Sequence, residues 1–238
     1  MKMYVVRMTI AALVAAAAPG LAEPTKHEEV KKPAAPPKPP RPGMVILDLK
    51  LPKPLFIGTP KNLRTPNLEP DRKGKLRPAF FVDKGVKKLS NKKPVTSSDS
   101  EPVIGEVEQV TDGDREGREG SYVELGPGKQ YVQIDLGKTY EIHVVLVWHY
   151  HGSARVYRDM VVQVCDDSDF IMDVTTVFNN DHDNSSGFGI GKDFEYIETY
   201  EGKLLDCKGA KGRYLRLYSN GSTAGDMNHY VEVEVYGK

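Results

Sequence analysis

The segment 131–137, YVQIDLG, constrains the fold of this chain more than any other stretch of its sequence. The apolar residues Val132, Ile134 and Leu136 alternate with polar ones, which is the two-residue period of a half-buried β-strand. The segment 231–237, VEVEVYG, repeats this pattern. No long stretch has the 3.6-residue period of an amphipathic helix. These features predict an all-β protein.

Further segments have the composition of short strands, and clusters of Gly, Asn, Asp and Ser separate them. The strands expected from Gly85 onward are 122–125, 132–136, 142–148, 160–164, 175–178, 203–205, 214–218 and 231–236. About eight short strands in roughly 150 residues are typical of an antiparallel β-sandwich or jelly roll. In such a fold the loops between the strands carry recognition.

Residues 1–22 have the pattern of a signal peptide that is cleaved after Ala22. Lys2 and Arg7 are the positive charges, and 8–18 is an apolar run well short of the roughly 20 residues that span a bilayer. We therefore expect a secreted or periplasmic protein with no transmembrane span. In an oxidising compartment Cys165 and Cys207 more often pair than stay free, which favours a disulfide over two separate buried thiols.

The net charge of zero hides a division along the chain. Residues 23–101 contain 18 Lys and Arg against 9 Asp and Glu, whereas residues 102–238 contain 13 against 24. We interpret 23–43 as a proline- and lysine-rich linker and 44–84 as an extended arm that packs on the domain 85–238. Export, and the lack of a basic and aromatic array in residues 102–238, argue against a nucleic-acid partner.

A resemblance to a known family covers roughly residues 85–238. The segments that carry it are VTDGD (110–114), 131–148, 160–170, RYLRLYSNG (213–221) and 231–237. They resemble a discoidin, or coagulation factor 5/8 type C, domain, one of the galactose-binding-like jelly rolls. The resemblance implies an antiparallel sandwich whose end loops bind sugars, lipids or proteins, often as a non-catalytic module attached to a carbohydrate-active enzyme.

The resemblance also implies a structural calcium ion between an Asp-Gly turn and a glutamate of the last strand. The matching residues are Asp112, Asp114 and Glu232, and calcium prefers such hard oxygen ligands. Ser121 and Tyr122 are the nearest equivalents of the Thr or Ser and the Trp that usually follow this turn. The alternative is an ordinary Asp-Gly turn on an acidic surface.

Three loop segments hold side chains that suit a sugar, which needs aromatic rings for its apolar face and polar groups for its hydroxyls. The candidate ligand-binding residues are His149, Tyr150, His151 and Arg155; Asn180, Asp181, His182 and Asn184; and Asn228 and His229. The alternative for the Asn- and Asp-rich segment is a polar loop whose side chains cap their own backbone.

Catalytic motifs such as G-x-S-x-G, C-x-x-C and H-E-x-x-H are absent from the sequence. The sequence thus predicts a non-catalytic module that binds a glycan or glycoconjugate. One alternative is a structural component of the cell envelope with a protein partner. Another is a zinc-dependent hydrolase, in which His149 and His151 bind the metal together with His182 or Asp181.

Overall fold

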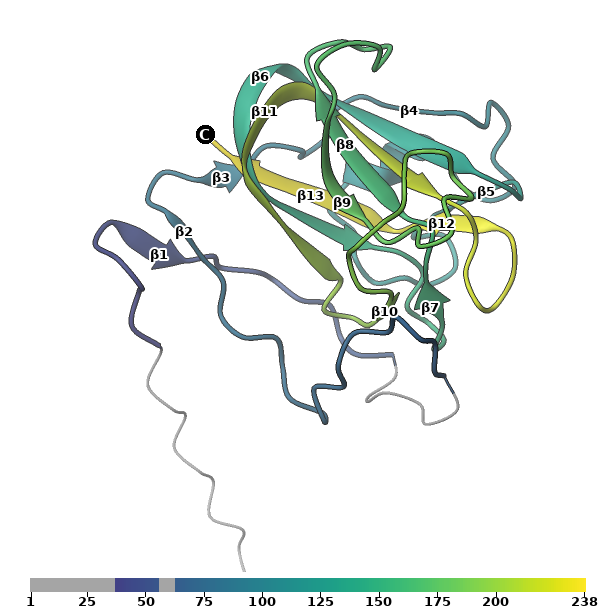
Figure 1. Ribbon diagram of the computed structural model, residues 1–238, viewed down its shortest axis with the longest axis horizontal. Coiled ribbons are helices and arrows are strands. Elements are labelled where there is room, and N and C mark those ends of the chain that lie inside the picture. The colour runs from purple at the N-terminus through teal and green to yellow at the C-terminus, as the bar shows by residue number, and fades with distance from the viewer. Residues whose placement is uncertain (1–36, 56–62) are drawn as a thin grey trace, which may run out of the picture. The chain divides into compact units, whose positions relative to one another are not determined.

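The computed structural model describes residues 37–55 and 63–238 (Figure 1). The strands are β1 (Met44–Ile46), β2 (Phe81–Asp83), β3 (Lys87–Lys88), β4 (Val95–Ser97), β5 (Val123–Leu125), β6 (Gln130–Trp148), β7 (Val156–Tyr157), β8 (Val161–Cys165), β9 (Thr175–Asn179), β10 (Tyr196–Ile197), β11 (Lys203–Ser219), β12 (Asn228–Tyr230) and β13 (Glu232–Gly237). The 3₁₀ turn η1 (Val107–Thr111) lies between β4 and β5. The predicted all-β class is confirmed. The expected signal peptide lies outside the described residues, and none of the helices within them is long and apolar enough to cross a membrane.

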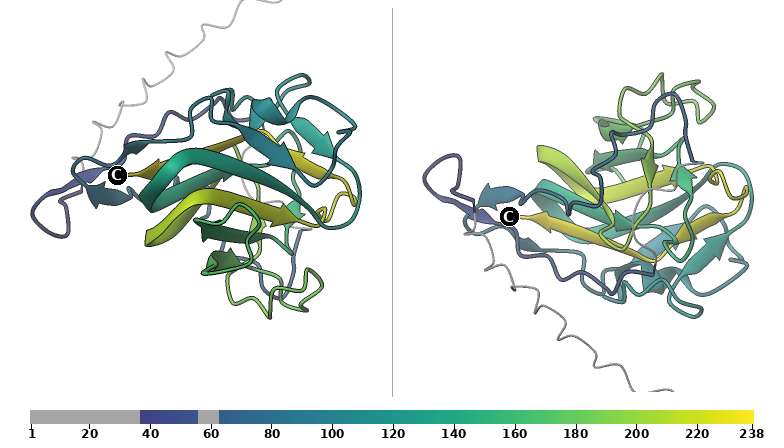
Figure 2. Two further views of the ribbon diagram at one scale, coloured as in Figure 1. Left: turned by 90° about the horizontal axis from the view of Figure 1, so that it is seen from above. Right: turned by 90° about the horizontal axis from the view of Figure 1, so that it is seen from below.

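The main sheet has the strand order β3-β13-β6-β11-β8-β9, and β4 also pairs with β6. All of these pairings are antiparallel. The first part of β6 pairs with β4 and its last part with β13, while β11 pairs with β6 almost throughout. The two long strands curve strongly and therefore contribute to both layers of the sandwich (Figures 1 and 2).

The bends fall at recognisable positions. Gly137 has a φ of 88°, which favours glycine, and the pairing of β11 with β6 shifts register between Asp206 and Ala210. At Gly212 a Cβ would lie 2.5 Å from Val164 Cγ1, so the close approach of β8 requires glycine there. These bends correct one expectation: 132–136 and 142–148 form one strand, as do 203–205 and 214–218.

The core lies between the two layers. Val132, Ile134 and Leu136 of β6 are fully buried in it, as the alternating pattern predicts. Val145 and Val147, from the last part of β6, belong to the same core, and burial of such side chains is worth about 1.5–3 kcal/mol each.

The opposite face of β6 is covered by the arm. Val144 packs there with Leu47, Leu49 and Phe80, beside Tyr236 of β13. The arm is fastened by backbone hydrogen bonds as well: the amide of Leu47 donates to Phe80 O at 2.8 Å, and residues 67–69 pair with Glu195. Both faces of this part of the sheet are therefore buried, which explains its continuous apolar sequence.

Candidate functional site

Five side chains gather beside the short β5–β12 ladder, and we call them the Tyr150 patch: Tyr122, Glu124, Tyr150, Arg155 and His229. The ladder places His229 opposite Glu124. Tyr122 directly precedes β5, and the connection from β6 to β7 supplies Tyr150 and Arg155. All five side chains are half-buried.

Tyr150 is the centre of this patch. The guanidinium carbon of Arg155 lies 4.6 Å from its ring centroid, and the rings of Tyr122 and His229 lie 5.2 and 5.7 Å away. Tyr122 meets it edge-on, at an interplanar angle of 71°. Such aromatic and cation–π contacts fix the orientation of the rings. The patch is therefore preorganised.

His229 is held in one tautomer by its neighbour. Its Nε2 lies 2.6 Å from Glu124 Oε2, so this nitrogen carries the proton and donates it to the carboxylate. Burial, followed by the positive charge of Arg155, lowers the pKa of His229 against the opposing effect of Glu124. The imidazole is thus neutral at pH 7, and Nδ1 is a hydrogen-bond acceptor.

Three polar atoms of this region are buried and have no hydrogen-bond partner among the described residues. They are Arg155 Nε, His229 Nδ1 and the hydroxyl of Tyr157. Burial raises the pKa of Tyr157, while the nearby charge of Arg155 opposes that rise. Unpaired buried polar atoms are rare in folded proteins, so the presence of three such atoms distinguishes this region.

A buried layer supports the patch from below. The ring of His149 stacks on Tyr157 at 4.3 Å, and its Nδ1 donates to the carbonyl of His229 at 2.7 Å. Burial lowers the pKa of His149 to about 4, so it stays neutral. Glu198 accepts hydrogen bonds from the amides of His149 and Thr199, and burial raises its pKa to about 8. His149 therefore positions the patch and does not face solvent.

Three further predicted ligand residues, all asparagines, form hydrogen bonds with other groups of the protein. Asn180 is fully buried, and its side chain bonds Met160 N and Tyr157 O. Asn228 is also buried and bridges Ser219, Gly221, Gly126 and Gly128. Asn184 accepts from the amide of Gly189. The local contact of Asn184 matches the capping alternative of the sequence analysis, whereas Asn180 and Asn228 bond backbone groups far away in the chain.

The histidines considered for zinc do not converge in the described part of the chain. His151 is buried and its Nε2 donates to Arg115 O at 2.8 Å, whereas His149 contacts His229 and Met160. His182 is half-buried in the β9–β10 connection, next to Asp181. Within residues 37–55 and 63–238, one group of three possible metal-binding side chains has all its ligand atoms within 4.8 Å of one another. It consists of Asp159, Asp181 and Asp183. Asp181 already accepts hydrogen bonds from the amides of Ser185 and Ser186.

Most carboxylate oxygens of the residues matched to calcium already accept hydrogen bonds or ion pairs. Glu232 Oε1 lies 3.1 Å from Lys88 Nζ, and its Oε2 accepts from the amide of Gly113. Asp114 accepts from Glu116 N and Ser121 Oγ, and Asp112 accepts from Asp114 N. The donor set as folded does not fit a calcium ion, because an ammonium and N–H groups already contact these oxygens. Calcium binding stays a prediction of the resemblance.

The predicted disulfide is wrong in this structure, because Cys165 and Cys207 are free and buried. Cys207 belongs to the core between the layers. Cys165 pairs in register with Tyr214, seven residues further along β11, and its Sγ contacts the carbonyl of Met172 at 3.0 Å. The two side chains thus belong to different parts of the sheet.

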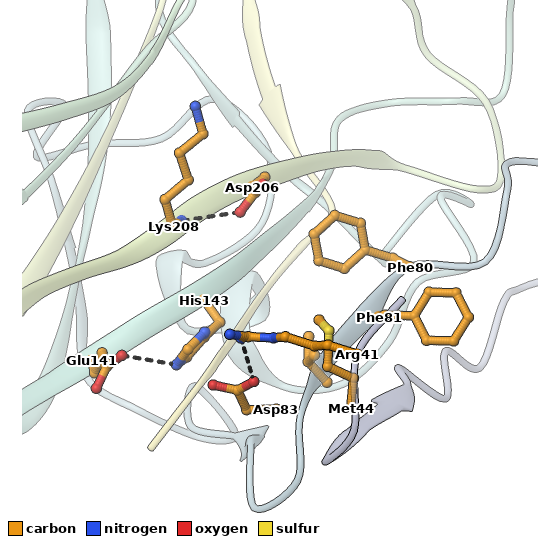
Figure 3. A pocket seen from close by; sticks show the side chains of 10 residues that line it. Arg41, Met44, Phe80, Phe81, Asp83, Glu141, His143, Asp206 and Lys208 are labelled. Atoms are coloured by element: carbon orange, nitrogen blue, oxygen red, sulfur yellow. Dashed lines mark hydrogen bonds and ion pairs between the residues drawn. The ribbon is translucent and has the colours of Figure 1, made fainter. Parts of the chain in front are cut away.

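A separate pocket of about 320 Å³ lies between the β1–β2 ladder and the bends of β6 and β11 (Figure 3). Arg41 pairs with Asp83 at 2.7 Å, and His143 Nε2 lies 3.4 Å from Glu141. Lys208 also lines this pocket, and its ammonium forms no ion pair with the described residues, so the pocket is polar as well. None of the predicted ligand residues lines it.

Sequence reasoning named Tyr150, Arg155 and His229 of this candidate site but missed Tyr122, Glu124 and Tyr157 as ligand-site residues. A signal for Glu124 exists, because it alternates with buried Val123 and Leu125 in the predicted strand and so points away from the core. No comparable signal identifies Tyr157, whose apolar surroundings resemble those of any core residue.

No protein-family model and no curated protein matches this chain. A fucose binding module from Streptococcus pneumoniae aligns with a TM-score of 0.47 and 19% identity, over 66% of this chain and 99% of the module. A chitosan-binding module of a Paenibacillus sp. IK-5 chitosanase/glucanase aligns with a TM-score of 0.43 and 19% identity, over 63% and 99%. A family 89 glycoside hydrolase from Clostridium perfringens has a TM-score of 0.46 and 17% identity; the alignment covers 63% of this chain but 14% of the hydrolase. Because these TM-scores are below 0.5, the similarities do not indicate what this chain binds.

Proposed function

We propose that this chain is an exported, non-catalytic module that binds a carbohydrate or glycoconjugate at the Tyr150 patch. The observation that supports it is the pair of unpartnered buried atoms Arg155 Nε and His229 Nδ1, which belong to side chains packed against the same half-exposed ring of Tyr150. Export enters the proposal through the signal-peptide pattern of residues 1–22.

The two atoms have complementary hydrogen-bonding roles. Arg155 Nε is a donor, and Nδ1 of neutral His229 is an acceptor. A sugar carries several hydroxyls, and each of them both accepts and donates, so its chemistry suits a site that offers a donor and an acceptor. The rings of Tyr122 and Tyr150 provide apolar surface for the C–H face of a sugar, as small-molecule sites with few convergent polar groups do.

The way the titratable groups are used supports binding without catalysis. Glu124 is committed to His229, and Glu198 lies fully buried below, bonded to two backbone amides. Neither carboxyl group is placed to act as an acid or base on a bond held at the patch. Recognition, by rings and hydrogen bonds on rigid strands, is the chemistry that these residues support.

A pair of neighbouring arginines tests the proposal. Arg155→Gln removes the unpartnered donor, whereas Arg158→Gln is the matched control, since Arg158 is exposed and its nearest ion partner, Asp159, lies 3.9 Å away. Both proteins are compared with wild type on a glycan array and by titration with the best glycan. We expect Arg155→Gln to lose about tenfold or more in affinity, because a hydrogen bond to a charged donor is worth about 1.5–3 kcal/mol. Equal affinity of the two variants, or an array without binding, would overturn the proposal.

A second candidate is contact with an envelope protein through the arm. A groove of about 450 Å³ along it is lined by Ile46, Leu49, Leu51, Leu76 and Phe80, among others, and Leu76 is 65% exposed. Exposed apolar surface of this kind is typical of protein contacts. Recovery of one stoichiometric partner that Leu76→Asp abolishes, together with a blank glycan array, would favour this function over the first.

A further inference from the structure

Two buried carboxylates lie side by side on the outer face of β13. Glu232 and Glu234 are two residues apart, so their side chains share a face of the strand, opposite to the core residues Val233 and Val235. Their exposed fractions are 0% and 1%. Two adjacent buried negative charges are unfavourable unless cations neutralise them.

The chain itself supplies two cations. Lys88 Nζ lies 3.1 Å from Glu232 Oε1 and 2.8 Å from Glu234 Oε1, while Arg115 Nε donates to Glu234 Oε1 at 2.8 Å. The position of Lys88 follows from the fold, because β3 pairs with the end of β13 and places Lys88 opposite Tyr236, on the face that carries both glutamates. Two positive groups thus balance two negative ones.

The same groups fasten the Asp-Gly turn. The amide of Gly113 donates to Glu232 Oε2 at 3.0 Å, and the carbonyl of Gly113 accepts from Arg115 Nη1 at 3.2 Å. A calcium ion would need six to eight oxygens directed at it. Here the turn presents an N–H group to the glutamate, and its carbonyl is bound by a guanidinium.

We propose that the ammonium of Lys88, seated between Glu232 and Glu234, takes the place of a divalent cation and holds the turn 112–114 against β13 without metal. The inference is independent of glycan binding. It implies that removal of the ammonium leaves a pair of unbalanced carboxylates beside an acidic turn, which is a donor set that calcium can use.

The test compares thermal unfolding in EDTA and in millimolar calcium for wild type, Lys88→Gln and Lys203→Gln. Lys203 is the matched control, because its side chain is 16% exposed, against 22% for Lys88, but it forms an ion pair with one carboxylate, Glu69 at 2.6 Å, where Lys88 pairs with two. Calcium binding is also measured directly by calorimetry.

We expect wild type and Lys203→Gln to unfold at the same temperature with and without calcium. Lys88→Gln should melt roughly 10 °C lower in EDTA, as breaking a buried ion pair does, and calcium should restore part of that loss. If Lys88→Gln does not fold in EDTA, the inference requires that it refolds when calcium is added. A wild type stabilised by calcium, or a Lys88→Gln protein that calcium neither stabilises nor refolds, would overturn it.

Discussion

Arg77 and Glu201 join the arm to the start of β11 through both main chain and side chain. The amide of Arg77 donates to Glu201 Oε1 at 2.9 Å, and Arg77 Nη2 donates to the carbonyl of Glu201 at 2.8 Å. A further bond runs from Arg77 Nη1 to Gly202 O at 2.9 Å. One arginine thus satisfies two carbonyls next to the sheet.

Arg77→Ala should lower the free energy of unfolding by about 2 kcal/mol, because it leaves part-buried carbonyls without their charged donor. Arg72→Ala is the control: Arg72 also pairs with Glu201, but its side chain is 38% exposed, so we expect a loss below about 1 kcal/mol. Urea unfolding of both variants measures the difference. Equal losses would show that the arm is not held by Arg77.

Glu198 should make stability fall with rising pH. Burial raises its pKa in the folded protein to about 8, above its usual value, so the folded state binds the proton more tightly than the unfolded state. The stabilisation is therefore complete below about pH 4.5 and is lost as the pH rises towards about 8. The cleanest window lies above about pH 6.5, because His149, with its lowered pKa, acts in the opposite sense below that pH.

Glu198→Gln should flatten the dependence of unfolding free energy on pH within this window. Urea titrations at several pH values in wild type and variant measure the slope. The prediction fails if both proteins lose the same stability between neutral pH and pH 8.

Glycan affinity should fall in acid, because binding uses the unprotonated Nδ1 of His229. Burial and Arg155 lower the pKa of this imidazole, so affinity is expected to be constant around neutrality and to decrease only below about pH 6.5. Glu124→Gln removes a charge that favours the imidazolium and should move the loss to lower pH. Calorimetric titration with glycan at a series of pH values measures the affinity of wild type and variant. If both proteins lose affinity at the same pH, His229 does not have this role.

Reducing agent should not change the melting temperature, because neither thiol is bridged. Labelling in denaturant without reductant should modify two thiols per chain, whereas the native protein should react slowly because both side chains are buried. A fall in melting temperature on reduction would restore the disulfide prediction.

The alternating residues predicted the strands well, since alternation records which side chains face the core, as at Val132 and Ile134. The length of β6 was not predictable, because Gly137 and the residues after it look like a turn when they in fact form a bend within one strand. The contact of the arm with the sheet could be predicted only in part. The apolar run at 144–148 indicates that both faces of the strand are buried, but it does not identify the segment that covers the second face.

The positions of candidate site residues could be predicted where a side chain of that type has one common role. Tyr150 and Arg155 were expected to lie at a loop end and do. Asn180 and Asn228 were expected to contact ligand, yet an asparagine amide fits a backbone turn as well as a sugar hydroxyl, and sequence does not distinguish these uses. The position of Lys88 between two glutamates depends on the pairing of β3 with β13, which joins residues far apart in the chain.

The passage of β6 and β11 through both layers has a mechanical consequence. Because each of these strands is continuous from one layer into the other, a force that pulls the layers apart is carried by covalent backbone and not only by packed side chains. The two layers therefore stay joined through the main chain even where side-chain packing between them is weakened.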